Sequence, residues 1–491
     1  MILFNVNRYR FLFKICILLL CYFYSVDSYS QKAYIRVSPR DCINCYLGFF
    51  NTSLNYKQKD NIQYIFPEDF EGKRFENFNE LYFHKKIGQQ QVIFSDSLYN
   101  ETKKPLNGLS GLVIYFKGKV IMALTAENAV GIDFRKYVDA ALNLKELSDF
   151  QKEGISPNVQ LAVDFENNNL AVSDFIFRKL SLYKNDRLIN KIDLKTDDFQ
   201  TLLKKFLTDK EFKFHKENYQ SIKDLGKNYP EYFWPEFSQG NLYLHYLLPY
   251  IRKGDDKENE AIVPSMNLVS KIPFSSKIKT SDIIEHSFQK DKNPNTENYS
   301  EFLKFFIYKK QYLVLNLLQG KTKSNDLFTA YKFNKTTQNL QFDHFYQLKN
   351  KYDSIYSLLS QPNKTTNNIA YSYSNGQVIL WFKPYSINLK NNTVHKLDWQ
   401  QKKKNDTYLY GQIQLWKNNG IYSVLGWNKI NRDPSYFIKN YDSNWDLISE
   451  TELPFYLPNV KGLLISKKNI YVRLQNRLLI LPNFILDSQN L

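Results

Sequence analysis

From about Gly154 to the end of the sequence one pattern recurs: an apolar strand, a short polar turn and a strongly alternating strand. The pattern is typical of a β-hairpin, because side chains alternate between the two faces of a strand and Asn or Gly favours the turn. Most hairpins are followed by a further strand. The repeat therefore predicts a series of similar, independent small sheets. Six hairpins begin at Val159, Tyr232, Leu303, Asn368, Tyr410 and Val460.

This spacing predicts a β-propeller over residues 155–491. Six hairpins with outer strands over about 337 residues give roughly 56 residues per unit, close to what a blade with long loops needs. A β-sandwich is the alternative, but radial repetition accommodates this many similar sheets more readily than two packed layers do. Six blades are favoured over five or seven, and the polar stretch of residues 280–300 is expected to be a long loop.

Residues 31–150 have a different pattern, in which short strands alternate with helical segments. The order is β-α-β-α-β-β-β-α or nearly so, which predicts an α/β layer. Asp41 is placed to cap the helix that carries Cys42 and Cys45 in its first turn. Strands are expected at 34–38, 61–67, 91–96 and in a hairpin at 111–125, and helices at 42–57, 74–86 and 134–150.

The composition agrees with folded, strand-rich domains. Apolar residues make up 43% of the chain and charged residues 23%, which is typical of a globular protein. Tyr and Phe number 36 and 37, and aromatic residues favour strands. The net charge is +17, but the longest basic run is Lys402-Lys403-Lys404 in a polar stretch. A nucleic-acid site would gather its charges with stacking aromatics, so we expect no nucleic-acid partner.

Residues 1–30 are typical of a secretory signal peptide. A positive segment containing Arg8, Arg10 and Lys14 precedes an apolar run at 15–24, and Ser28 and Ser30 suit cleavage before Gln31. The apolar run is about ten residues, and a membrane-spanning helix needs about 20. We expect an exported protein, periplasmic or extracellular, without an integral membrane segment after cleavage.

Two alternatives remain for this N-terminal segment. The first alternative to a cleaved signal peptide is a signal anchor that the protein retains, and the second is a lipoprotein signal that ends at Cys21. Acylation is disfavoured because Leu20 stands where a lipobox needs a small residue.

The cysteines are informative because two of the four leave with the signal peptide. The mature chain keeps Cys42 and Cys45, three residues apart. A disulfide between them closes a very small loop, which removes little chain entropy and stabilises the fold weakly. Redox chemistry is therefore favoured over a structural bond. The start of a helix stabilises a thiolate through free N–H groups and the helix dipole, so Cys42 is the expected nucleophile and Cys45 the resolving thiol.

Metal binding and cofactor binding are not expected. A structural zinc site needs four ligands, and no second cysteine pair accompanies the first. The six histidines are scattered through the sequence, at His84, His215, His245, His286, His344 and His395.

Residues 34–145 resemble a thioredoxin-like domain of the exported bacterial thiol-disulfide type. The resemblance rests on the segment "SPRDCINCYL" and on the strand order. The remainder resembles, by its pattern, the six-bladed NHL-like propellers of exported bacterial proteins. The resemblance implies that Cys42 matches the attacking cysteine and Cys45 the resolving one. This sequence departs from the family at the pair, which encloses Ile43-Asn44, and before the strand from Gly111, where Leu109-Ser110 replaces the family's cis-proline.

Two functions follow from these observations. The first is an exported thiol-disulfide oxidoreductase or redox-handling protein that exchanges with protein thiols or disulfides, its propeller docking a ligand or protein. The second is a non-enzymatic propeller binding protein with a degenerate thioredoxin-like scaffold. Candidates to line a propeller channel, for which buried structural roles are the alternative, are Asp164, Asp174, Trp381 and Trp427.

Overall fold

The chain divides into two compact units in a computed structural model. The α/β unit comprises residues 1–145, 453–461 and 481–491, and the β unit comprises residues 146–452 and 462–480. The predicted signal peptide lies outside the described residues. The structure describes residues 31–38, 41, 43–56, 61–131, 134–147, 159–174, 179–193, 209, 213, 232–238, 240–252, 261–276, 285–290, 305–309, 311–315, 326–334, 339–347, 371–374, 376–380, 385–391, 393–397, 414–430, 433–456 and 458–485.

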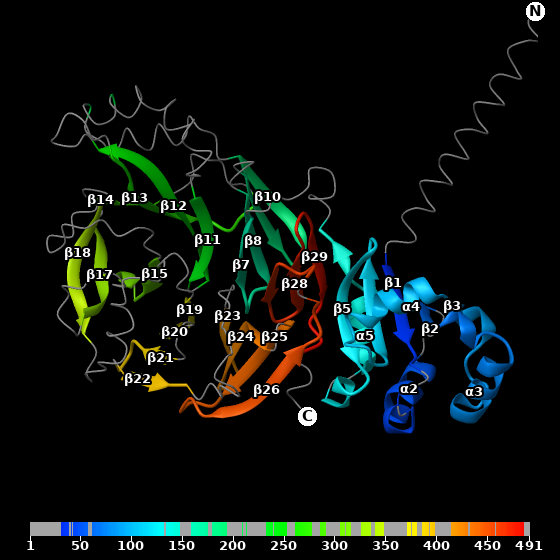
Figure 1. The fold of residues 1–491 in the computed structure, drawn as a ribbon. Coiled ribbons are helices and arrows are strands. Elements are labelled where there is room, and N and C mark those ends of the chain that lie inside the picture. The colour runs from blue at the N-terminus through cyan, green and yellow to red at the C-terminus, as the bar shows by residue number, and fades with distance from the viewer. Residues whose placement is uncertain are drawn as a thin grey trace, which may run out of the picture. The chain divides into compact units, whose positions relative to one another are not determined.

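The α/β unit contains a five-stranded sheet in the order β3-β2-β1-β4-β5 (Figure 1). Strands β1, β2 and β3 are parallel, and β4 is antiparallel to β1 and to β5. Lys117 and Gly118 form the predicted hairpin turn with φ of 47° and 75°, a conformation that glycine adopts easily. The strands are β1 (Gln31–Arg36), β2 (Ile62–Phe66), β3 (Val92–Phe94), β4 (Gly111–Phe116) and β5 (Lys119–Thr125).

Helices connect these strands, and aromatic side chains attach them to the sheet. Phe66 of β2 is fully buried, and its ring lies 5.3 Å from that of Phe75 and 5.8 Å from that of Phe78. Both partners are on the face of α3 that is buried, so this cluster fixes α3 against β2. The helices are η1 (Ile43–Tyr46), α2 (Leu47–Leu54), η3 (Glu68–Phe70), α3 (Lys73–Phe83), η4 (Gln89–Gln91), α4 (Asp96–Lys103), η5 (Asn128–Gly131) and α5 (Phe134–Leu142).

Residues from the far end of the chain complete the α/β unit. The backbone N–H of Ala123 donates to the Pro454 carbonyl at 2.9 Å, and that of Tyr456 donates to the Ile121 carbonyl at 2.8 Å. These bonds cover the edge of β5. Phe484 is buried and lies edge-to-face against Tyr137 of α5, with ring centroids 5.5 Å apart. The domain boundary that the sequence predicts near residue 150 does not account for residues 453–461 and 481–491 in the α/β unit.

The β unit contains five sheets among the described residues, four of four strands and one of eight. Their orders are β10-β9-β8-β7, β11-β12-β13-β14-β18-β17-β16-β15, β19-β20-β21-β22, β23-β24-β25-β26 and β27-β28-β29-β6. The strands are β6 (Lys145–Glu146), β7 (Gln160–Asp164), β8 (Asn169–Asp174), β9 (Lys179–Lys184), β10 (Arg187–Asp193), β11 (Tyr232–Ser238), β12 (Asn241–Arg252), β13 (Ala261–Ile272), β14 (Glu285–Lys290), β15 (Phe305–Tyr308), β16 (Gln311–Leu315), β17 (Asp326–Asn334), β18 (Asn339–Gln347), β19 (Tyr371–Ser374), β20 (Gln377–Leu380), β21 (Tyr385–Asn388), β22 (Thr393–Lys396), β23 (Gln414–Asn418), β24 (Ile421–Ile430), β25 (Asp433–Tyr441), β26 (Leu447–Leu453), β27 (Gly462–Ile465), β28 (Asn469–Arg473) and β29 (Leu478–Pro482).

These sheets have a β-propeller-like arrangement (Figure 1). The first strands of neighbouring sheets lie beside one another: β7 contacts both β11 and β27, and β19 contacts β23. Strands β7 to β10 and strands β19 to β22 each form an antiparallel meander, the form of a propeller blade, and β23 to β25 pair in the same way. Asn419 and Gly420, with φ of 48° and 84°, form the tight turn between β23 and β24 that the sequence predicts.

Strand β6, which precedes the first sheet of the β unit along the chain, completes the last sheet. Strand β6 is the outer strand of the sheet formed by β27, β28 and β29, and the Leu147 N–H donates to the Leu478 carbonyl at 3.0 Å. Arg477 Nη1 lies 2.9 Å from both carboxylate oxygens of Glu146. Because β6 precedes β7 along the chain, this pairing closes the β unit on itself.

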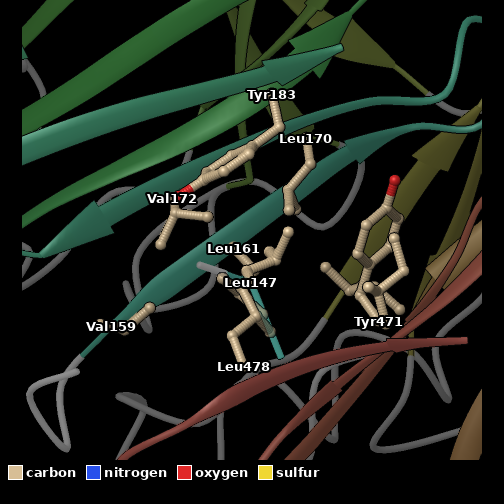
Figure 2. Close-up of a cluster of buried hydrophobic side chains, with 10 residues drawn as sticks. Leu147, Val159, Leu161, Leu170, Val172, Tyr183, Tyr471 and Leu478 are labelled. Atoms are coloured by element: carbon tan, nitrogen blue, oxygen red, sulfur yellow. The ribbon is translucent and has the colours of Figure 1, made fainter. Parts of the chain in front are cut away.

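A hydrophobic cluster lies between the first and last sheets of the β unit (Figure 2). Tyr183 of β9 and Tyr471 of β28 are each no more than 1% exposed. This packing supports the closure by β6. The buried members of the cluster are Leu147, Val159, Leu161, Leu170, Val172, Tyr183, Leu464, Tyr471, Leu478 and Ile480.

The prediction of a long loop at residues 280–300 is wrong in part, because β14 lies within it and pairs with β13 over six residues. The backbone N–H and C=O groups along β13 need hydrogen-bond partners, and β14 supplies them although residues 280–300 are polar. Helix α4 was not predicted either, although Ser95 caps it by accepting the Leu98 N–H.

Candidate functional site: the chain after strand β1

The predicted thiol pair follows β1, the central strand of the α/β sheet. Cys42 lies outside the described residues, and Cys45 is described in its backbone alone, within η1. The described surroundings of the pair are residues 36–38, Asp41 and the loop before β4.

The turn between β1 and Cys42 is bonded to the loop that precedes β4. The Ser110 N–H donates to Oδ2 of Asp41 at 2.6 Å. In the opposite direction, the Ser38 N–H donates to Oγ of Ser110 at 2.9 Å, and Ser110 is fully buried. Asp41 also closes the turn through its own N–H, which donates to the Ser38 carbonyl at 3.0 Å. Ser110 therefore connects both ends of this turn to the sheet.

Arg36, the last residue of β1, holds the same loop from the interior. Its side chain is 2% exposed, and Nη1 donates to the carbonyls of Gly108 at 2.7 Å and Leu109 at 2.9 Å. Its Nε donates to the Tyr99 carbonyl at 3.4 Å, and its Cζ lies 4.1 Å from the centre of the Tyr99 ring. The guanidinium thus ties β1, α4 and the 108–110 loop together.

The charge of Arg36 has two opposing influences. Burial lowers the pKa of Arg36, whereas Tyr99 and the nearby Asp41 carboxylate raise it. A guanidinium stays protonated in proteins, so a buried positive charge stands close to the residue that precedes Cys42. Its carbonyl partners accept hydrogen bonds from Nε and Nη1 but, being neutral, do not cancel its charge.

The prediction that both cysteines occupy the first turn of an α-helix is wrong for Cys45. Residues Ile43–Tyr46 form a 3-10 turn, and α2 begins at Leu47. Such turns are common where an α-helix starts, and Ile, Asn and Tyr have modest helix propensity. Asp41 is also not the cap that the sequence predicts, since the described partner of its carboxylate is the Ser110 N–H. The helix-dipole argument for a stabilised thiolate is correspondingly weaker.

Sequence reasoning missed Arg36 and Tyr99, and it marked Ser110 only as standing where the family has a cis-proline. Arg36 carried a signal, because it is a lone charge in the otherwise apolar strand "YIRV". A charge in a fully buried strand needs polar partners, so its presence indicates a built polar site. Tyr99 carried no local signal, since its contact with Arg36 spans 63 residues. Ser110 was marked by its place before β4, but its bond to Ser38, 72 residues away, was not predictable.

The candidates for a propeller channel are not brought together among the described residues. Asp164, 8% exposed, accepts the backbone N–H and the side-chain Nδ2 of Asn167 in its own turn, as the structural alternative expects. Asp174 is buried at the end of β8. Trp381 lies outside the described residues, and Trp427 is described only as a backbone position in β24. The channel assignment remains a prediction.

The histidines of the described chain have separate surroundings. His84 ends α3 with φ of 50°, His395 is exposed on β22, and Nε2 of the buried His245 lies 2.8 Å from Oε2 of Glu236. His286 and His344 are described as backbone positions in β14 and β18, and His215 falls outside the described part. Within that part, no three His, Cys, Asp or Glu side chains gather as a metal site would require. Nor does any helix there have the length and apolar character to cross a membrane.

Comparisons with known proteins found similarity in solved structures alone: no protein-family model and no curated protein matches the chain. A DUF4221-family member from Bacteroides vulgatus is similar at 10% identity and a TM-score of 0.39, over 69% of this chain and 95% of that chain. A luciferin-regenerating enzyme is similar at 7% identity and a TM-score of 0.33, over 69% and 95%. A gluconolactonase from Xanthomonas campestris is similar at 9% identity and a TM-score of 0.28, over 69% and 88%.

Proposed function

We propose that the protein is an exported thiol-disulfide exchange protein that reacts through Cys42 and Cys45. The observation that carries this proposal is the place of the C-x-x-C. It directly follows the central strand β1, and the turn before it is bonded to the loop that precedes β4. The order β2-β1-β4-β5, with β4 antiparallel to its neighbours, resembles the sheet of thioredoxin-like domains, which supports the same assignment.

The exchange has two steps in which atoms and electrons balance. The Cys42 thiolate attacks one sulfur of a partner disulfide, which forms a mixed disulfide and releases the first partner thiolate. The Cys45 thiolate then attacks the Cys42 sulfur, which closes the Cys42–Cys45 disulfide and releases the second. The partner disulfide gains two electrons, and the two cysteines of this chain lose them. In the reverse direction the same steps oxidise a partner dithiol.

An oxidising compartment suits this chemistry, and export by residues 1–30 is the route we propose. Disulfides form and persist in the periplasm and outside the cell, whereas cytosolic thiols are kept reduced. The mature N-terminus is then at or near Gln31.

We propose further that the β unit has six blades and docks the partner protein or ligand. The eight-stranded sheet consists of two antiparallel meanders, β11–β14 and β15–β18, joined by one parallel residue pair, Phe288 and Asn339. Counting each meander as a blade gives six with the four remaining sheets. Propellers present broad surfaces at the ends of their blades, which suits docking of a macromolecule.

Substitution of Cys45 by serine in the full-length protein is expected to trap partners covalently on Cys42. The mixed disulfide forms, but the thiol that resolves it is absent. Affinity purification after acid quenching and alkylation, followed by gel electrophoresis without reductant, should detect adducts that disappear when reductant is added.

Cys42→Ser is the matched control, since it leaves one thiol in the same segment but removes the attacking one. It is expected to trap nothing. Equal adducts in the two variants indicate nonspecific oxidation, and their absence from both contradicts the redox proposal and favours the propeller as a binding module with an inert scaffold.

A further inference from the structure

The bonds around the C-x-x-C form a chain of contacts that starts in the interior of the α/β unit. Arg36 binds the carbonyls of residues 108 and 109, and the next residue, Ser110, binds Asp41. The backbone of Asp41 continues directly into Cys42. Cys42 therefore directly follows Asp41, whose carboxylate Arg36 positions indirectly through residues 108–110.

Holding a loop with a buried arginine carries a cost in folding free energy. Moving a charge out of water costs free energy that neutral carbonyls recover only in part, and apolar residues of similar size often stabilise a core as well. The guanidinium, however, binds two successive carbonyls through Nη1 and the Tyr99 carbonyl through Nε, and its plane fixes these directions in a way that an apolar side chain cannot. Arg36 therefore provides directional hydrogen bonds to residues 108 and 109 that an apolar side chain would not.

We propose that Arg36 and Asp41 are positioning residues that hold the C-x-x-C turn in the geometry in which its disulfide closes; this inference rests on the proposed redox function. Arg36 fixes the loop, the loop fixes Asp41, and Asp41 fixes the start of the turn. Holding two thiols in a closing geometry before reaction favours the intramolecular disulfide, because less chain freedom is lost when the bond forms.

The consequence is a measurable change in redox equilibrium. Arg36→Met, which removes the Nη1 and Nε donors, is expected to lower the equilibrium constant for disulfide formation with glutathione about tenfold, which raises the reduction potential by about 30 mV. Arg36→Lys retains the charge, but its single nitrogen cannot bind the two loop carbonyls and the Tyr99 carbonyl in the fixed plane of a guanidinium, so we expect about a threefold change.

Asp41 supplies a matched pair of variants. Asp41→Ala removes the acceptor of the Ser110 N–H, and about a tenfold change is expected. Asp41→Asn retains an oxygen acceptor at the same place, so its equilibrium is expected to stay within about threefold of the wild type. The pair thus separates loss of the hydrogen bond from loss of the side-chain charge.

The decisive test is a double-mutant cycle on the full-length protein, equilibrated with glutathione and read by alkylation and mass spectrometry. Residues that act through one loop are not additive, so Arg36→Met with Asp41→Ala should match either single variant at about tenfold, and not reach about a hundredfold. Arg36→Lys keeps the test available if Arg36→Met does not fold, through the same cycle with Asp41→Ala.

The outcomes are distinguishable. A hundredfold change in the double variant, or a loss of thermal stability with no change in the glutathione equilibrium, overturns the positioning role and leaves the redox function intact. A wild-type chain whose cysteines do not exchange with glutathione overturns the proposed function and this inference together.

Discussion

Replacing Phe484 with alanine is expected to lower the free energy of unfolding of the α/β unit by about 3–5 kcal/mol, because truncation of a buried phenylalanine leaves a cavity. Phe484 is 7% exposed and contacts Tyr137 and Phe455 through its ring. The variant loses that packing on α5 although the substitution lies far along the chain. Hydrogen exchange followed by mass spectrometry should show faster exchange in peptides from α5 and β5.

Leu81→Ala is the control for this variant, since Leu81 belongs to the same unit and is 67% exposed. Its effect should stay within about 0.5 kcal/mol. Phe484→Leu retains most of the buried apolar volume, and a loss below about 1.5 kcal/mol is expected. Unchanged exchange in α5 after Phe484→Ala contradicts the assignment of the C-terminal segment to the α/β unit.

Replacing Trp416 with alanine is the second large expected effect, a loss of about 3–5 kcal/mol in the stability of the β unit. Trp416 of β23 is 1% exposed and stacks on Phe165, which follows β7, with ring centroids 5.3 Å apart. The substitution therefore loosens the contact between two sheets of the propeller-like arrangement. Proteolysis in increasing urea should show a lower midpoint for cleavage within residues 159–193.

Trp416→Phe tests the origin of that loss. The indole N–H is buried and has no hydrogen-bond partner among the described residues, and such a group costs about 1–3 kcal/mol. Phenylalanine removes the unsatisfied donor and keeps a ring for Phe165, so the two effects should offset to within about 1 kcal/mol. A loss as large as that of the alanine variant argues that ring stacking on Phe165 is not what stabilises the contact.

Local patterns predicted most of the secondary structure. The hairpin from Gly111 to Thr125 and the tight turn at Asn419-Gly420 were predictable because alternation and turn residues lie within a few positions of each other. The same holds for the hairpin of β7 and β8. The propeller-like arrangement followed from repetition of this local signal.

Contacts between distant segments were not predictable in the same way. Segment 453–461 interrupts the predicted propeller to cover β5, and nothing in its composition identifies that partner. At the candidate site, the position of the cysteines after β1 followed from strand order, whereas the contacts of Arg36 with residues 108 and 109 depend on a loop 72 and 73 positions away. Variants of the full-length chain are accordingly preferred to isolated fragments.

The measurement that tests the central claim most directly is the redox behaviour of the purified full-length protein. We would equilibrate it with glutathione across a range of reduced-to-oxidised ratios, quench with an alkylating agent and measure the mass of the peptide that contains both cysteines. The account predicts that Cys42 and Cys45 change together, as a two-electron couple, from two alkylated thiols to one disulfide. Persistence of two alkylated thiols at every ratio, or a disulfide that no ratio reduces, would contradict it.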